Sequence, residues 1–149
     1  MTVTEARPRC EFDPDALVSR VDVAVPGDIK AIAPAVEEIM QAVGEMSCAA
    51  GKEFEIEVAL TEALANAVVH GCAEDPGKSV QVCAACDPAR GILIMVRDPG
   101  PGFDPSQVPS PVVGQQIYAE GGRGIYLINR LMDDVQFERG GTEIWMTKR

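Results

Sequence analysis

The sequence contains no long hydrophobic run and no export signal. Unbroken apolar runs such as residues 92–96 are far too short to span a bilayer. The first dozen residues contain four charged side chains and no apolar stretch of the kind that a signal peptide needs. We therefore expect a cytoplasmic protein that is not bound to a membrane.

Basic residues are scarce. Lys and Arg number 13 against 23 Asp and Glu, which gives a formal net charge of −10. This balance argues against a nucleic-acid or anionic-membrane binder, because such a protein would expose a basic face. A nucleotide ligand stays compatible with it, since backbone N–H groups and a metal ion can hold phosphates.

Histidine is nearly absent, and the cysteine count is odd. His70 is the single histidine among 149 residues, so a zinc site would have few partners. Cys83 and Cys86 form a C-x-x-C motif in a predicted strand, where a spacing of three places them on opposite faces. Five cysteines without an export signal do not suggest a disulfide framework, and we expect buried free thiols.

The length and composition of the chain suit one folded domain, because 149 residues of which 46% are apolar can bury a core. We expect a loose tail over residues 1–14 and a single domain over residues 15–149. Hydrophobic periodicity predicts helices at 33–51, 53–70 and 125–132, and strands at 17–25, 79–86, 91–97, 135–138 and 142–147. This order favours an α+β two-layer sandwich with a mixed, mostly antiparallel sheet and helices packed on one face.

Three polar side chains recur four residues apart on the second predicted helix. Glu62, Asn66 and His70 therefore share one stripe of that helix. An Asn oxygen is a hard ligand that suits Mg²⁺, and a Glu one turn away could accept a proton from a hydroxyl. The alternative interpretation is a solvated polar face.

A short acidic and glycine-rich segment follows the strand predicted at 91–97. Asp98 ends the strand, and Gly100 and Gly102 come directly after it. Such a carboxylate can accept a hydrogen bond from an exocyclic amine, while the glycines let the backbone approach a flat ligand closely. The alternative is an ordinary Pro-Gly turn.

A second glycine-rich segment, Gly122-Arg123-Gly124, opens the third predicted helix. Glycines at a helix start present N–H groups and the positive end of the dipole to an anion, and Arg123 could add a phosphate contact. The alternative is a flexible hinge. The sequence has neither the G-x-x-x-x-G-K-[ST] pattern of a P-loop nor a G-x-G-x-x-G dinucleotide fingerprint.

In this combination and order, the segments resemble the GHKL ATPase superfamily, and within it the small anti-sigma-factor serine/threonine kinases. Residues 62–71 resemble the N box of that family, residues 98–102 its first glycine box and residues 122–124 its second. The pair Gly141-Thr142 resembles the closing glycine-threonine segment. The resemblance covers residues 15–149.

The resemblance implies a role for each of these residues. Asn66 would bind the Mg²⁺ that bridges the ATP phosphates, and Glu62 would be the catalytic base. Asp98 would accept a hydrogen bond from the adenine amine, with Thr142 beside it. The remaining binding residues would be Gly100 and Gly102 at the adenine, Gly122, Arg123 and Gly124 at the phosphates, and His70 near the phosphate side, with residues 103–121 as the lid.

The resemblance also implies a function and partners. The protein would be an ATP-dependent serine/threonine kinase and anti-sigma factor that binds a sigma factor and phosphorylates an anti-anti-sigma protein of the STAS type. It implies no direct contact with nucleic acid or membrane, and it is compatible with a homodimer. Two alternatives stay open, namely an ATP-binding module that sequesters a partner without phosphorylating it, and a structural domain with degenerate motifs.

Overall fold

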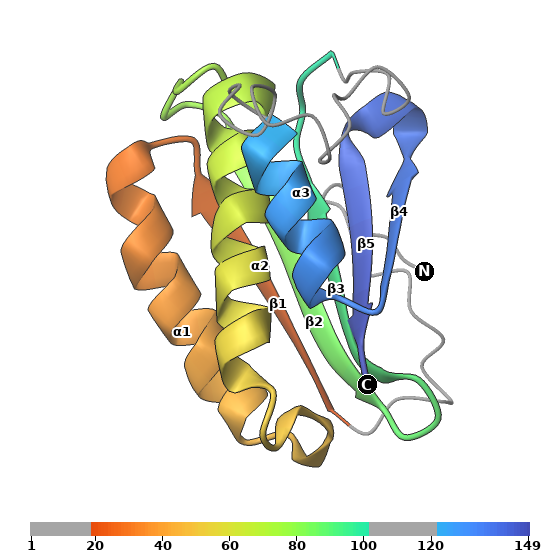
Figure 1. Cartoon of the computed structure of the whole chain (residues 1–149). Coiled ribbons are helices and arrows are strands. Elements are labelled where there is room, and N and C mark those ends of the chain that lie inside the picture. Colours follow the sequence, from red (N-terminus) through yellow and green to blue (C-terminus); the bar gives the residue numbers. More distant parts are fainter. Residues whose placement is uncertain (1–18, 102–121) are drawn as a thin grey trace, which may run out of the picture.

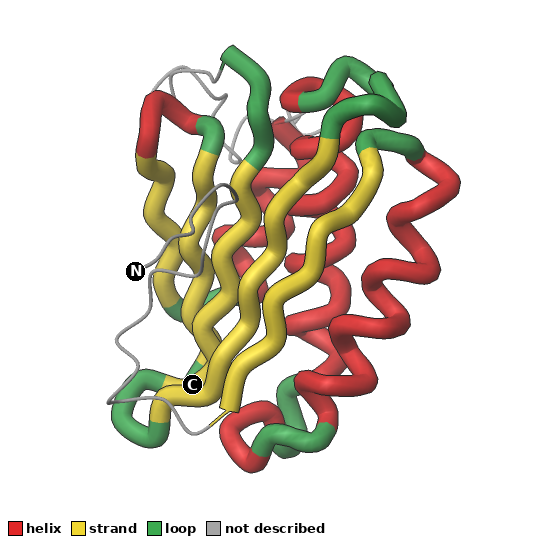
Figure 2. The backbone as a smooth tube through the Cα atoms, turned by 180° about the vertical axis from the view of Figure 1, so that it is seen from behind, coloured by secondary structure: helices red, strands yellow, loops and turns green. Residues whose placement is uncertain are grey.

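A computed structural model describes residues 19–101 and 122–149, and these form two layers (Figure 1). The strands form one sheet in the order β1-β2-β3-β5-β4, and each described strand pairing is antiparallel. Three α-helices cover one face of the sheet, and Figure 2 shows the opposite face without helices. The predicted α+β two-layer sandwich is confirmed. The elements are β1 (Ser19–Pro26), α1 (Ile32–Gly44), α2 (Glu53–Asn66), β2 (Ser79–Asp87), β3 (Gly91–Arg97), α3 (Gly122–Leu131), β4 (Asp134–Glu138) and β5 (Glu143–Lys148).

The strands predicted at 79–86 and 91–97 form one antiparallel hairpin, and those predicted at 135–138 and 142–147 form another. The β2–β3 turn is closed by the Asp87 carboxylate, which accepts hydrogen bonds from Ala89 N–H at 2.8 Å and from Arg90 Nε at 2.7 Å. The Ala89 N–H, followed by Arg90, holds the pKa of Asp87 below its usual value. The β4–β5 turn uses Gly140 and Gly141 at φ angles of +70° and +93°, where a side chain would be strained.

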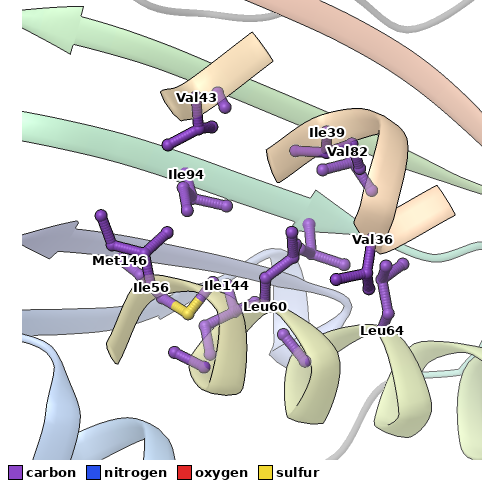
Figure 3. Packing of buried hydrophobic residues seen from close by; sticks show 14 of the residues in the cluster. Val36, Ile39, Val43, Ile56, Leu60, Leu64, Val82, Ile94, Ile144 and Met146 are labelled. Atoms are coloured by element: carbon purple, nitrogen blue, oxygen red, sulfur yellow. The ribbon is translucent and has the colours of Figure 1, made fainter. Parts of the chain in front are cut away.

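The core lies between the helices and the covered face of the sheet (Figure 3). Apolar residues recur at helical spacing on α1 and on α2, so each helix has an apolar stripe. Both stripes pack on the sheet. Full burial of each such side chain contributes about 1.5–3 kcal/mol. The labelled core residues are Val36, Ile39 and Val43 of α1, Ile56, Leu60 and Leu64 of α2, and Val82, Ile94, Ile144 and Met146 of the sheet.

A smaller cluster lies on the other face of the sheet. Cys83, Leu93 and Met95 are buried there, and Trp145 packs against them. Cys86 belongs instead to the core beneath the helices. The prediction that Cys83 and Cys86 point to opposite faces is therefore confirmed, and the described residues contain no cluster of three or more potential metal-ligating side chains.

The first helix is shorter than predicted. It ends at Gly44 rather than near Gly51, because Glu45 N–H closes the last turn on Ala42 and Met46 adopts an extended backbone. The Met46 side chain is thereby buried in the core. A short 3₁₀ turn, η2 (Ser47–Ala49), then leads to α2.

The expectation that the cysteines are free thiols is wrong for Cys48, Cys83 and Cys86, which are disulfide-bonded. Cys48 in η2 and Cys86 at the end of β2 form a disulfide, with their Cα atoms 5.7 Å apart. The two residues are 38 positions apart in sequence, and only the packing of the α1–α2 connection on the sheet brings them together. Among the described cysteines, Cys72 is a buried free thiol.

Two predictions concern segments outside the described residues, namely the tail over residues 1–14 and the lid over residues 103–121. The division of the chain at residue 15 stays a prediction. Within residues 19–101 and 122–149, every helix is too short or too polar to cross a membrane.

Candidate functional site

The first group of predicted site residues lies where α2 packs against the start of α3 (Figure 1). A Cβ atom added at Gly124 would lie 2.9 Å from Glu62 Oε1 and 3.3 Å from Asn66 Nδ2. Gly124 is buried, while Glu62 and Asn66 are half-buried. The absence of a side chain at Gly124 therefore leaves the helix start open to these two polar side chains.

This arrangement fits a magnesium-bound polyphosphate. The first turn of α3 contains Gly122, Arg123 and Gly124, and its N–H groups carry the positive end of the helix dipole. The Asn66 side chain lies beside that helix start and carries an oxygen suited to Mg²⁺, which keeps several water and phosphate ligands of its own. N–H donors for phosphate oxygens and an oxygen ligand for the metal ion therefore lie in one place.

The second group surrounds Asp98 at the end of β3. Asp98 N–H donates to Thr142 C=O at 2.9 Å, which confirms that the two residues are neighbours. Gly100 N–H donates to Asp98 Oδ1 at 2.8 Å. Burial raises the pKa of the Asp98 carboxyl above its usual value, and the Gly100 hydrogen bond opposes that shift only in part.

Two glycines allow the backbone to close around Asp98. A Cβ atom at Gly71 would overlap the Asp98 side chain, and one at Gly100 would lie 2.5 Å from Gly71 O. Gly71 ends η3 (Ala67–Gly71), a π-helical turn that continues α2 directly from Asn66. The Asn66 and Asp98 groups are therefore joined by one short helical turn.

An ion-pair network on the opposite face of the sheet supports the Asp98 group. Arg97 Nε lies 2.6 Å from Glu143 Oε2, and Trp145 Nε1 donates to Glu143 Oε1 at 2.8 Å. Arg97 pairs with Glu143 across β3 and β5, so this contact holds together the two strand ends that continue into Asp98 and Thr142. Sequence reasoning missed this support, although opposite charges that flank Asp98 and Thr142 in otherwise apolar strands were a signal.

The structure describes the remaining predicted site residues in less detail. His70 is exposed in η3, and no described contact joins it to Glu62 or Asn66. Gly122 and Arg123 begin α3, whereas Gly102 lies outside the described residues. The roles assigned to these four residues stay predictions, as do the roles of the other site residues.

Comparison with known proteins identifies the family of this chain. The chain is 36% identical over 101 residues to proteins named serine-protein kinase RsbW from Bacillus cereus (strain AH820) and Bacillus anthracis (strain CDC 684 / NRRL 3495), and 35% identical over 104 residues to one from Bacillus thuringiensis (strain Al Hakam). Each match covers 63% of this chain and 62% of the relative. The family model described as histidine kinase-like ATPase domain matches residues 25–148. The chain therefore belongs to the family of histidine kinase-like ATPase domains, as the resemblance to GHKL ATPases predicted.

Proposed function

We propose that this protein is an ATP- and Mg²⁺-dependent serine/threonine kinase that also acts as an anti-sigma factor. The observation that carries the proposal is the junction of α2 with α3 and β3. Glu62 and Asn66 face the bare helix start at Gly124, and Asp98 lies one π-helical turn away behind Gly71. A candidate base, metal ligand, anion site and acceptor for a purine amine are thus brought together where these three elements meet.

Each residue has a task that its chemistry allows. Asp98 accepts a hydrogen bond from the adenine amine, and the N–H groups at the start of α3 hold phosphate oxygens. Asn66 would hold the magnesium ion, and the charge of the ion would offset that of the phosphates. Glu62 accepts the proton of the attacking serine or threonine hydroxyl. Phosphoryl transfer needs mainly such positioning and charge neutralisation, so an acidic protein can carry it out.

The names of the relatives suggest the protein substrate. The relatives are named serine-protein kinases, and the family that the sequence resembles binds a sigma factor and phosphorylates an anti-anti-sigma protein. We extend these two partners to this chain and place it in the cytoplasm, where sigma factors act on RNA polymerase. The chain spans about 62% of the length of the relatives it matches, so their full activity and partners are part of the proposal.

Two measurements, made one after the other, test the proposal. Calorimetric titration with ADP in millimolar magnesium should show saturable binding at one site. Incubation with labelled ATP and the cognate anti-anti-sigma protein should then transfer label to a serine or threonine of that protein. An absence of heat with adenine nucleotides would contradict nucleotide binding itself, whereas binding without transfer would favour the second candidate.

The second candidate is a nucleotide-binding module that sequesters its partner without phosphorylating it. One observation favours it, since residues 103–121 contain no Lys or Arg that could reach the transferred phosphate. Arg123, in the first turn of α3, is the basic residue left to take that place. The transfer experiment separates the two candidates, because both should bind ATP.

The variant Asp98→Asn should bind ADP about 10- to 100-fold more weakly, because a charge-assisted hydrogen bond contributes roughly 1.5–3 kcal/mol. Circular dichroism should show an unchanged fold, since Asn has the same size and Asp98 lies at the end of β3. Asp134→Asn, an exposed position on β4, is the matched control and should bind ADP as the wild type does. Equal affinity of wild type and Asp98→Asn would contradict the role of Asp98.

Binding should also depend on pH through Asp98. Burial raises the pKa of its carboxyl above the usual value near 3.8, so protonation removes the acceptor at a higher pH than for an exposed Asp. ADP affinity should therefore be highest well above that raised pKa and fall as the pH is lowered through it. Calorimetric ADP titrations at a series of acidic pH values measure this dependence. In Asp98→Asn, the loss of affinity that is due to Asp98 protonation should be absent, whereas the loss that is due to protonation of the nucleotide phosphates should remain.

A further inference from the structure

The last turn of the second helix is wider than an α-helical turn. Cys72 N–H donates to Ala67 C=O at 2.9 Å, which spans five residues instead of four. Such π-turns insert one extra residue into a helix and are frequent at functional sites. The π-turn ends at Gly71, which lies next to Asp98 at the end of β3.

The backbone at the end of the π-turn lies directly against the Asp98 side chain. A Cβ atom at Gly71 would overlap Asp98 Cβ, Cγ and Oδ1. The segment is fixed on its far side, because Glu74 N–H donates to Val68 C=O at 3.0 Å and the backbone reverses at Ala73 and Glu74 with φ angles of 52° and 58°. Gly71 is therefore held in contact with Asp98 rather than merely near it.

Gly100 packs against Gly71 and the Asp98 carboxylate from the other side. A Cβ atom there would lie 2.7 Å from Gly71 Cα and 3.0 Å from Asp98 Oδ1. Among the described residues, Gly100 N–H is the hydrogen-bond donor to this carboxylate. The carboxylate is thus confined between two glycine backbones, with Oδ1 engaged and Oδ2 left as an acceptor.

We propose that Gly71 is a positioning residue that sets the direction of the Asp98 carboxylate and thereby the affinity for the base of the nucleotide. The inference rests on the proposed function, in which Asp98 receives the adenine amine. Any side chain at position 71 would turn or push the carboxylate away from its Gly100 hydrogen bond. The phosphate side at Gly124 and Asn66 lies at the other end of the π-turn and keeps its geometry.

The test compares Gly71→Ala with Gly44→Ala, because a Cβ atom at Gly44, the last residue of α1, would meet no atom within 4 Å. We expect Gly71→Ala to weaken ADP binding roughly tenfold, the loss of one well-placed hydrogen bond. Binding of magnesium tripolyphosphate, which has no base, should stay unchanged. Gly44→Ala should bind both ligands as the wild type does.

Combination with Asp98→Asn distinguishes positioning from a general structural effect. In the Asp98→Asn background, Gly71→Ala should cost little further ADP affinity, since the contact that it orients is already lost. Wild-type ADP affinity in a folded Gly71→Ala protein would overturn the inference, and so would an equal loss of tripolyphosphate binding.

A second variant covers the case in which Gly71→Ala does not fold. Gly100→Ala crowds the same carboxylate from the opposite side and should also lose ADP affinity while keeping tripolyphosphate. A folded Gly100→Ala protein with wild-type ADP affinity would then overturn the inference. Failure of the wild type to bind ADP at all would instead contradict the proposed function.

Discussion

Glu62→Gln is expected to lower phosphotransfer to the anti-anti-sigma protein by about 10²- to 10⁴-fold, the usual contribution of a positioned general base. The amide has the shape of the carboxylate but cannot accept the hydroxyl proton. Glu62 lies beside the bare helix start at Gly124 rather than at the adenine side, so ADP affinity should stay close to that of the wild type. Single-turnover transfer of labelled phosphate, measured with calorimetric ADP binding, checks both halves of this expectation.

A matched control is available on the same helix. Glu57 is exposed five residues before Glu62, and Glu57→Gln makes the same change of charge away from the site. It should transfer phosphate at the wild-type rate. Equal rates for Glu62→Gln and wild type would contradict the role of Glu62 as base, and an equal loss in both variants would point to an effect of net charge.

Removal of the Cys48–Cys86 disulfide is expected to lower the free energy of unfolding by about 4 kcal/mol. The cross-link closes a loop between residues that are 38 positions apart, and the chain-entropy relation for that length gives about 4 kcal/mol. Cys48→Ala is the cleaner variant, because Cys48 is half-buried whereas Cys86 is fully buried in the core. Urea unfolding without reductant, followed by circular dichroism, measures the difference.

Reduction supplies the control for this prediction. In the presence of a strong reductant, wild type and Cys48→Ala should unfold at the same urea concentration, since neither then has the cross-link. A persistent gap would show that the loss comes from side-chain packing at position 48. Alkylation of both thiols in the unfolded, unreduced wild type would contradict the disulfide itself.

The sequence was most informative where a local pattern sets the structure. The two apolar segments at 79–86 and 91–97, with the polar turn that begins at Asp87 between them, predicted two neighbouring strands because turn chemistry is local. The helical spacing of Ile56 and Leu60 predicted the core face of α2 for the same reason. The order of the motifs then identified the family, and the structure brings Gly124 close to Glu62 and Asn66.

Features that depend on packing between distant segments could not be predicted in this way. The disulfide depends on how the α1–α2 connection folds onto the end of β2. The π-turn depends on one hydrogen bond, from Cys72 to Ala67, that replaces the α-helical one without a change in hydrophobic pattern. The early end of α1 depends on the burial of Met46, whose spacing fits a continued helix equally well.

The position of the Cys48–Cys86 cross-link has a consequence for motion. It ties the α1–α2 connection to the sheet beside the β2–β3 turn, whereas α2 and β3 end at the opposite end of the two layers (Figure 1). Separation of the layers is restricted at the tied end, and the link places no such restriction on the opposite end, where α2 and β3 end. The covalent link therefore stiffens the end of the domain that lies away from the candidate site residues.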